Sequence, residues 1–443
     1  MTITSNIDQT APQEMTSLQI TAVVICIIIN FLDGFDVIAI AFAAPEIARD
    51  WSLDPAALGI VFSSGLAGMV IGALLLSPLA DRFGRRPLIL LCLCVISAGM
   101  LASAAAGQVE HLMAMRLLTG IGVGGMLSSL TTMVAEYSSE RRRQLAISIL
   151  QSGYPVGGII AGLTSVYLIG EHGWRSVFVV GGTLSLAMMP LVYLGLPESL
   201  DFLFNQRKPE TLGRVNTLRK RMKQPQLDAL PDLDSLSVQK SSVADIFAPT
   251  YLGRTIAIWT CFVMVMSAWY FVINWTPKVL VDAGLSQKVG ISGGMLLSIG
   301  GVIGGLTVGW LSSWVRVSSL CAGFMITAIG AMAIFGRLEI NLTMMLVVAF
   351  LIGVLIAGSM IGLYITVPSL YPVRIRNTGT GWALGIGRLG AVAGPYMAGV
   401  LIGLDWDRGA LYFAMGLPLV ISAAALLWLG SNAQSGINPR AKI

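Results

Sequence analysis

Runs of about twenty apolar residues recur along almost the whole chain, and they limit the folds that are open to it. We count twelve, at approximately 19–44, 56–80, 88–107, 110–136, 145–169, 174–196, 254–280, 289–312, 317–336, 341–369, 378–403 and 408–430. A helix of about 20 residues crosses the hydrocarbon core of a bilayer. Only 12% of the residues are charged, whereas soluble domains carry about 25%. The sequence therefore predicts an all-α integral membrane protein with twelve transmembrane helices and no soluble catalytic domain.

No cofactor or metal is expected from the sequence. The five cysteines all fall within predicted helices, and no thiol and imidazole groups have the spacing of a metal site. No Gly-x-x-x-x-Gly-Lys loop is present, so ATP is not expected to drive the protein. The first apolar run has no basic segment before it and no small-residue cleavage site after it, so we expect a retained helix rather than a signal peptide.

Basic residues predict the orientation of the helices. Arginines gather after the second, fourth, eighth and tenth runs, at Arg82, Arg85, Arg86, Arg141, Arg142, Arg143, Arg316, Arg374 and Arg376. Because short cytoplasmic loops are enriched in Lys and Arg, these loops are expected on the cytoplasmic side. The prediction is a multi-pass protein of the cytoplasmic (inner) membrane with both termini in the cytoplasm.

The long polar stretch at 198–253 divides the chain into halves of six predicted helices, at 1–197 and 254–443. We expect this stretch to be a solvated cytoplasmic loop, although its basic part could instead lie on anionic lipid headgroups. The halves share an internal repeat, because an arginine-containing loop follows the second and fourth helices of each. Duplicated halves with a site between them are typical of secondary transporters.

Asp33 and Asp36 lie within the first apolar run, in the segment Asn30-Phe-Leu-Asp-Gly-Phe-Asp-Val-Ile38. A carboxylate near the middle of a spanning helix costs about 2.5–3.5 kcal/mol, whereas each Leu, Ile, Phe or Val returns only about 0.3–0.6 kcal/mol. Positions three apart share a helix face, so both acids are expected to look toward one partner or one water-filled cavity. Such a cost indicates a functional role.

Proton coupling needs a group that alternates between charged and neutral forms, and burial beside a second acid favours the neutral form. We predict that one of Asp33 and Asp36 is the protonation site and that the other holds an arginine. The sequence does not decide which acid has which role. The alternative is a purely structural ion pair.

Two arginines are embedded in predicted helices, Arg116 in the fourth and Arg388 in the eleventh. A guanidinium group can bind a carboxylate through two parallel hydrogen bonds, so each is a candidate substrate contact. Alternatively, each arginine satisfies helix carbonyl groups or a buried acid such as Asp33.

Several segments together resemble a known family. The loop Leu79-Ala-Asp-Arg-Phe-Gly-Arg-Arg86 is similar to the signature of the major facilitator superfamily, and Asp33-Gly-Phe-Asp36 resembles that of its aromatic acid:proton symporters. Further matching segments are Arg116–Gly125, Pro197–Ser199, Arg376–Trp382 and Arg388–Gly390. The resemblance implies two six-helix pseudo-repeat bundles and proton-coupled import of a benzoate or hydroxybenzoate type of acid by alternating access. The alternative substrate is a non-aromatic organic acid such as muconate or another dicarboxylate; a drug-exporting antiporter ranks third.

The resemblance also implies a gate. The predicted gating residues are Asp81, Arg82, Arg85, Arg86, Glu136, Arg143 and Arg376, and in the superfamily such a cluster latches the outward-open state. For the arginines, a role in topology alone is an equal alternative. The second copy of the loop signature departs from the pattern, because Ser313 and Trp314 replace its usual acid and base.

Aromatic residues and one amide are candidate contacts for a substrate ring and its hydroxyl groups: Phe35, Tyr154, Trp269, Tyr270, Asn274, Trp275, Tyr364 and Trp382. Aromatic residues at helix ends can instead anchor the protein at the headgroup level. The expected partners are a small acid, protons and membrane lipid, with no nucleic acid, and the protein is expected to act as a monomer.

Other classes of function fit the sequence less well. Gly120–Gly125 and Gly385–Gly390 match a dinucleotide-binding pattern, but both lie within predicted spanning helices with no preceding strand. Gly290-Ile-Ser-Gly-Gly294 matches a nucleophile elbow, yet it lacks a strand and plausible triad partners. We therefore predict that the protein is not an enzyme; a membrane esterase and a sensor without transport are the rival interpretations.

Overall fold

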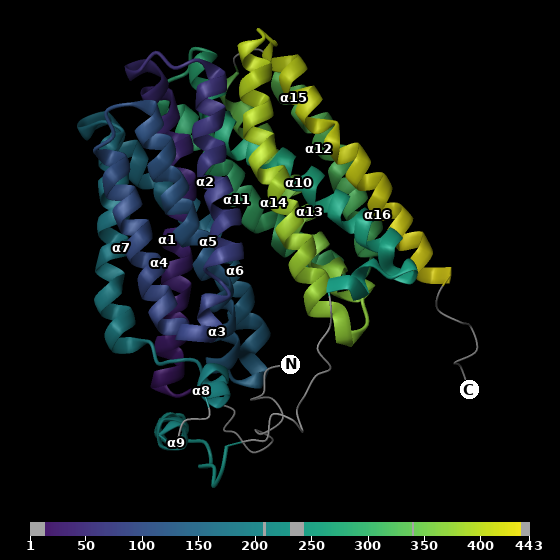
Figure 1. The fold of residues 1–443 in the computed structure, drawn as a ribbon. Helices are drawn as coiled ribbons and strands as arrows, with labels where there is room; N and C mark the ends of the chain where they lie inside the picture. The colour runs from purple at the N-terminus through teal and green to yellow at the C-terminus, as the bar shows by residue number, and fades with distance from the viewer. Residues whose placement is uncertain (1–13, 207–209, 231–242, 339–340, 436–443) are drawn as a thin grey trace. The chain divides into compact units, whose positions relative to one another are not determined.

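The computed structural model describes residues 14–206, 210–230, 243–338 and 341–435, and within these ranges it is built of helices without β-strands (Figure 1). The first half contains α1 (Ser17–Asp50), α2 (Pro55–Leu75), α3 (Leu79–Phe83), α4 (Arg85–Ala104), α5 (Val109–Tyr137), α6 (Glu140–His172) and α7 (Arg175–Gly195). The second contains α10 (Pro249–Asp282), α11 (Gln287–Leu311), α12 (Val317–Arg337), α13 (Leu342–Thr366), the 3-10 turn η3 (Val367–Leu370), α14 (Val373–Gly403), α15 (Arg408–Gly416) and α16 (Pro418–Ser435). The prediction of an all-α protein is confirmed.

Among the described residues, twelve helical segments are long and apolar enough to cross a membrane, as the sequence predicted. The last of these, Arg408–Ser431, is divided into α15 and α16. Pro418 begins α16, a position where the missing N–H of proline costs no hydrogen bond. A single predicted helix is therefore two helices that follow one another directly.

The described residues form two compact units, one from the ranges 14–37, 67–161, 175–206 and 210–230 and the other from 38–66, 162–174, 243–338 and 341–435. In the first unit, α4 packs against α5 and α7; in the second, α12 packs against α13 and α16. These are corresponding helices of the two halves. The same neighbours therefore recur, which is the internal repeat expected from the sequence.

Glycines form close helix–helix contacts at corresponding places in the two halves. A Cβ atom on Gly72 of α2 would lie 2.9 Å from the Cα atom of Ile121 in α5, and one on Gly304 of α11 would lie 2.9 Å from the Cα atom of Val354 in α13. Backbone surfaces thus meet directly in both pairs. Such small-residue contacts are a usual means of packing helices in a membrane.

The division into units passes through α1, α2 and α6 as well as through the polar stretch at 198–253. The segments 38–66 and 162–174 belong to the second unit, although the sequence assigns them to the first half. The boundaries at 197 and 254 remain a prediction about the repeat.

Part of the polar stretch folds, in contrast to a simple solvated loop. It contains α8 (Leu200–Gln206), α9 (Thr211–Arg221) and the 3-10 turn η2 (Val243–Phe247). The helix α8 buries four residues, Leu200, Phe202, Leu203 and Phe204. These apolar residues give this short helix a packing surface. The sequence did not predict it, because the helix lies in a polar stretch. Arg207, Lys208, Asp232 and Asp234 lie outside the described residues.

Candidate transport site

Asp36 of α1 is completely buried in the first unit, against α7. The Ser185 hydroxyl of α7 donates a hydrogen bond to Asp36 Oδ2 at 3.3 Å. The other oxygen, Oδ1, has no hydrogen-bond partner among the described residues. It lies next to Gly181, where an added Cβ atom would be 2.7 Å away. One oxygen is therefore held and the other is left against bare backbone.

Arg116 of α5 is buried beside Asp36, but it contacts the main chain of that residue. Its Nη2 donates to the Asp36 carbonyl oxygen at 2.7 Å, and its Nη1 lies 3.1 Å from Met100 Sδ. The guanidinium carbon is 5.7 Å from the centroid of the Phe178 ring. In the described part of the chain, no ion pair within 4 Å joins Arg116 to Asp33 or Asp36. The charge of Arg116 is thus held by a helix carbonyl and an aromatic face.

Asp33 is also buried, at 3% exposure, and faces a different neighbour. It lies within electrostatic range of Cys92 on α4, and its Oδ2 has no hydrogen-bond partner among the described residues. Asp33 and Asp36 are therefore both enclosed in the first unit, each with an unpartnered oxygen. Burial of such atoms is costly, so their retention supports a functional role.

A second group of predicted residues meets within the second unit. Tyr364 of α13 lies within electrostatic range of Tyr270 on α10 and Arg388 on α14. Its ring centroid is 5.5 Å from that of Phe262, and Asn274 Nδ2 donates to the Tyr270 carbonyl oxygen at 2.8 Å. Three helices thus bring together two phenol groups and a guanidinium group. Arg388, Tyr270 and Tyr364 are all half-buried, unlike the enclosed Arg116.

The predicted tryptophans are engaged elsewhere in the second unit. Trp275 is 1% exposed; its Nε1 donates to the Pro395 carbonyl oxygen at 2.9 Å, and its ring packs edge-on against Phe62. Trp382 is half exposed and stacks on Trp259, with ring centroids 6.1 Å apart. The partners of both tryptophans named above are thus residues other than Arg388, Tyr270 and Tyr364.

A close junction within the second unit surrounds Trp275. Ser63 of α2 donates to the Val392 carbonyl oxygen of α14 at 2.7 Å. An added Cβ atom on Gly399 of α14 would lie 3.1 Å from the Cα atom of Gly59 in α2. The segment 38–66 is therefore closed against α10 and α14, through residues that the sequence analysis did not single out, except for Trp275.

The predicted gating residues separate into two sets. Arg85 at the start of α4 forms an ion pair with Glu136 near the end of α5 and donates to Ser199 Oγ at 2.7 Å. Arg86 donates to the Tyr193 carbonyl oxygen. The remaining predicted residues, Asp81, Arg82, Arg143 and Arg376, take no part in these contacts; three are exposed and Arg143 is half-buried.

Glu198 and Ser199 join Arg85, Arg86 and Glu136 in one polar cluster. The sequence analysis gave neither Glu198 nor Ser199 a role. Gly84, with φ of +104°, precedes α4 and supplies no side-chain cap. Instead, Glu198 Oε1 accepts from the backbone N–H groups of Arg85 at 2.9 Å and Arg86 at 3.2 Å. A negatively charged side chain is stabilised near the N-terminus of a helix, which is the positive end of the helix dipole. A glycine directly before a helix beginning with two arginines was a usable hint that a cap must come from elsewhere.

Asp201 in α8 adds another acid beside Glu136. Burial raises the pKa of the Asp201 carboxyl, an effect that Arg85 partly opposes. Two neighbouring carboxyl groups, those of Glu136 and Asp201, therefore lie beside the half-buried guanidinium group of Arg85.

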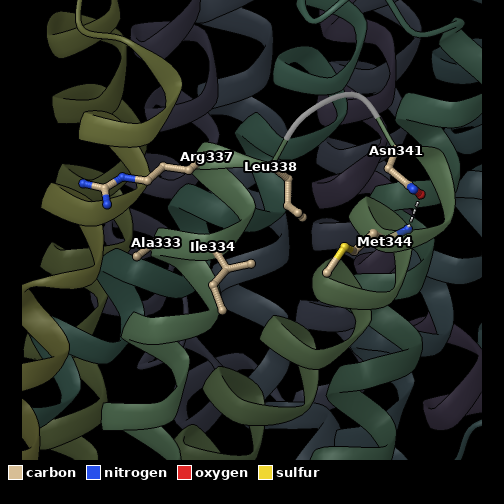
Figure 2. A pocket seen from close by; sticks show the side chains of 6 residues that line it. All are labelled: Ala333, Ile334, Arg337, Leu338, Asn341 and Met344. Atoms are coloured by element: carbon tan, nitrogen blue, oxygen red, sulfur yellow. Dashed lines mark hydrogen bonds between the residues drawn. The ribbon is translucent and has the colours of Figure 1, made fainter.

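A hollow at the turn between α12 and α13 lies apart from the predicted site residues. It is lined by Ala333, Ile334, Arg337, Leu338, Asn341 and Met344 (Figure 2). The Asn341 side chain accepts from the Met344 N–H at 3.1 Å and thereby caps α13. The Asn341 side chain serves the helix end, and none of the predicted site residues lines the hollow, so we do not assign it to transport.

Twelve spanning helices in two repeated sets, with charged groups enclosed among them, define a secondary transporter. The chain belongs to the Major Facilitator Superfamily, whose family model matches residues 26–336. This confirms the family resemblance found in the sequence and the prediction that the chain is a transporter and not an enzyme.

Curated relatives cover nearly the whole chain. The gallate transporter of Pseudomonas putida is 34% identical over 91% of this chain and 90% of its own length. The 4-hydroxybenzoate transporter PcaK of Pseudomonas aeruginosa is 33% identical over 96% of each chain. The benzoate transport protein of Acinetobacter baylyi is 26% identical over 95% of this chain and 91% of its own length.

Solved structures share the fold at lower identity. A bacterial homologue of the human lysosomal transporter Spinster gives a TM-score of 0.74 at 20% identity, covering 94% of this chain and 98% of that one. A D-xylose–proton symporter gives a TM-score of 0.72 at 16% identity, covering 93% and 97%. The predicted major facilitator fold is confirmed.

Proposed function

We propose that this protein imports an aromatic carboxylate of the benzoate or hydroxybenzoate type together with protons, by alternating access. The observation that carries the proposal is the full-length similarity to curated transporters of gallate, 4-hydroxybenzoate and benzoate. The protein is proposed to act as a monomer in the cytoplasmic membrane, with both termini in the cytoplasm.

The group around Tyr364 supports an aromatic acid as the substrate. Arg388 offers a cation for a carboxylate, while the half-buried rings of Tyr270 and Tyr364 offer apolar faces with hydroxyl groups at their edges. A guanidinium group beside two phenols suits a flat acid that carries ring hydroxyls. In this proposal, Arg388 binds the carboxylate and the tyrosines contact the ring.

The buried acids support proton coupling. Asp33 and Asp36 each keep an oxygen without a hydrogen-bond partner among the described residues, and neither is paired with Arg116 through its side chain. A carboxyl group in such a place can be neutral in one state and charged in another. The proposed cycle protonates an acid on α1 before inward release of the substrate.

Muconate or another dicarboxylate is the alternative substrate. It was predicted to use both Arg116 and Arg388, but Arg116 is 2% exposed and already donates to a carbonyl oxygen. This geometry favours a monocarboxylate bound by one arginine.

The test is uptake of labelled acids into vesicles with an imposed inward proton gradient, with and without an uncoupler. The panel contains benzoate, hydroxybenzoates, gallate, muconate and a sugar. Uncoupler-sensitive accumulation of an aromatic acid is expected. Accumulation of muconate alone would replace the substrate class, and accumulation that ignores the uncoupler would refute proton coupling.

A further inference from the structure

The side chain of Ser185 in α7 donates a hydrogen bond to the carboxyl group of Asp36. The two side chains are joined by a 3.3 Å hydrogen bond, and the residues are 1% and 0% exposed. From this geometry we infer that Ser185 is a positioning residue for proton exchange at Asp36 and sets the pH range in which transport operates. The inference rests on the proposed proton coupling and assigns it to a particular contact.

A hydroxyl group suits both protonation states of the acid. The Ser185 O–H can donate to a charged carboxylate, and its oxygen can accept from a protonated carboxyl group after rotation. Both side chains are buried, so the hydrogen bond joins them directly. Ser185 can therefore remain hydrogen-bonded while the proton at Asp36 arrives and leaves.

Gly181 completes the arrangement from the same helix. It lies four residues before Ser185, so the two positions share one face of α7. An added Cβ atom on Gly181 would lie 2.7 Å from Asp36 Oδ1 and 3.0 Å from the Phe35 ring. The helix α7 thus binds one carboxyl oxygen and leaves space for the other, which has no hydrogen-bond partner among the described residues.

Other titratable and charged groups around Asp36 come from α1 itself and from α4, α5 and α6. Arg116 of α5 acts on it directly, Asp33 lies one turn earlier on α1, Tyr154 of α6 lies within electrostatic range of Arg116, and Cys92 of α4 within range of Asp33. All four remain when Ser185 is replaced. A changed pH profile in such a variant therefore reports the loss of the Ser185 contact.

Ser97 provides a matched control. It is buried in α4, and its hydroxyl donates to the Gly182 carbonyl oxygen of α7 at 2.7 Å. Like Ser185→Ala, Ser97→Ala removes a buried serine hydroxyl group and the hydrogen bond that it donates, in this case between α4 and α7. It leaves the Asp36 carboxyl group untouched.

The experiment measures the initial rate of hydroxybenzoate uptake into vesicles against external pH, for the wild type, S185A, S97A and S185T. Hydrogen bonds to charged acceptors are stronger than those to neutral ones, so losing the Ser185 donor disfavours the charged carboxylate. We expect the pH of half-maximal uptake in S185A to move by about one unit toward alkaline pH. S97A is expected to keep the wild-type profile, and S185T, which retains a hydroxyl, to restore it.

Two failures can be told apart. If wild-type uptake depends on pH and on the uncoupler, but the S185A and S97A profiles coincide with it, the role of Ser185 is refuted and the proposed function stands. If wild-type uptake does not respond to protons, the proposed coupling fails and the inference fails with it. If S185A is not inserted in the membrane, S185C, which has a similar volume and a weak donor, is measured instead, and an unshifted profile refutes the inference.

Discussion

Asp33 and Asp36 show how far single residues could be predicted. Their cost in an apolar helix marked them directly in the sequence, and both are buried in the structure. Their separate neighbours, Cys92 for Asp33 and Ser185 for Asp36, were not predictable, because a serine or cysteine in an apolar helix carries no such cost. Likewise, Arg116 was identified, and a helix carbonyl group was one of the partners considered for it, but the choice of the Asp36 carbonyl depends on three-dimensional packing.

Replacing each acid separately tests the proposed coupling. In Asp33→Asn and Asp36→Asn, we expect the variant of the protonation site to retain substrate exchange while losing at least tenfold in proton-driven accumulation, because a permanently neutral amide cannot release a proton. Counterflow and gradient-driven uptake measured on the same vesicles distinguish the two activities. If both activities vanish together in both variants, the acids have no separable role in coupling.

Arg388 tests the proposed substrate contact. Arg388→Gln should raise KM for hydroxybenzoate about tenfold or more, since a charge-assisted hydrogen bond is worth about 1.5–3 kcal/mol. Arg388→Lys keeps the positive charge but loses the paired donors, so its KM should lie between those of the wild type and Arg388→Gln. Uptake kinetics over a concentration series, with Arg214→Gln in α9 as an exposed-arginine control, would decide. An unchanged KM in Arg388→Gln would exclude this contact.

The positions of the spanning helices were the most predictable feature of the structure. Their length and hydropathy placed twelve spans within a few residues, since an apolar helix must match the thickness of the bilayer. The helices α8 and α9 were missed because they are short, lie in a polar stretch and depend on packing rather than on length. The cap on α4 was missed for a similar reason, since Glu198 is more than a hundred residues from the N–H groups that it accepts from.

Glycine contacts between helices predict a large difference between similar substitutions. In α11, Gly304→Val would force a side chain against the backbone of Val354, whereas Gly330→Val in α12 meets no atom within 4 Å. We expect overpacking to cost Gly304→Val about 1–3 kcal/mol and to lower its yield and thermal stability in detergent, with Gly330→Val near the wild type. Equal melting temperatures would show that α11 and α13 can separate without penalty.

At the scale of the whole molecule, the repeat was predictable and the division into compact units was not. The arginine loops revealed the duplication, because both copies keep part of the same pattern. The assignment of 38–66 and 162–174 to the second unit depends on contacts such as Ser63 with Val392, which connect residues over three hundred positions apart. Apolar periodicity in one sequence contains no information on that pairing.

The junction between α2 and α14 can be tested as part of the transport cycle. A side chain at Gly399 would meet the Pro55 carbonyl oxygen and the Gly59 Cα atom, whereas Gly403, one turn later, meets nothing within 4 Å. We expect Gly399→Val to reduce both uptake and exchange at least tenfold while equilibrium binding of the acid persists, because the closed arrangement cannot form. Gly403→Val serves as the control. Normal exchange in Gly399→Val would show that the cycle does not require this junction.

Three continuous helices, α1, α2 and α6, pass from one compact unit into the other. The boundary between the units therefore falls within unbroken helices and not only within the polar stretch. Asp36 lies directly before this boundary in α1, so a change of charge at its carboxyl group would act on a helix that both units share.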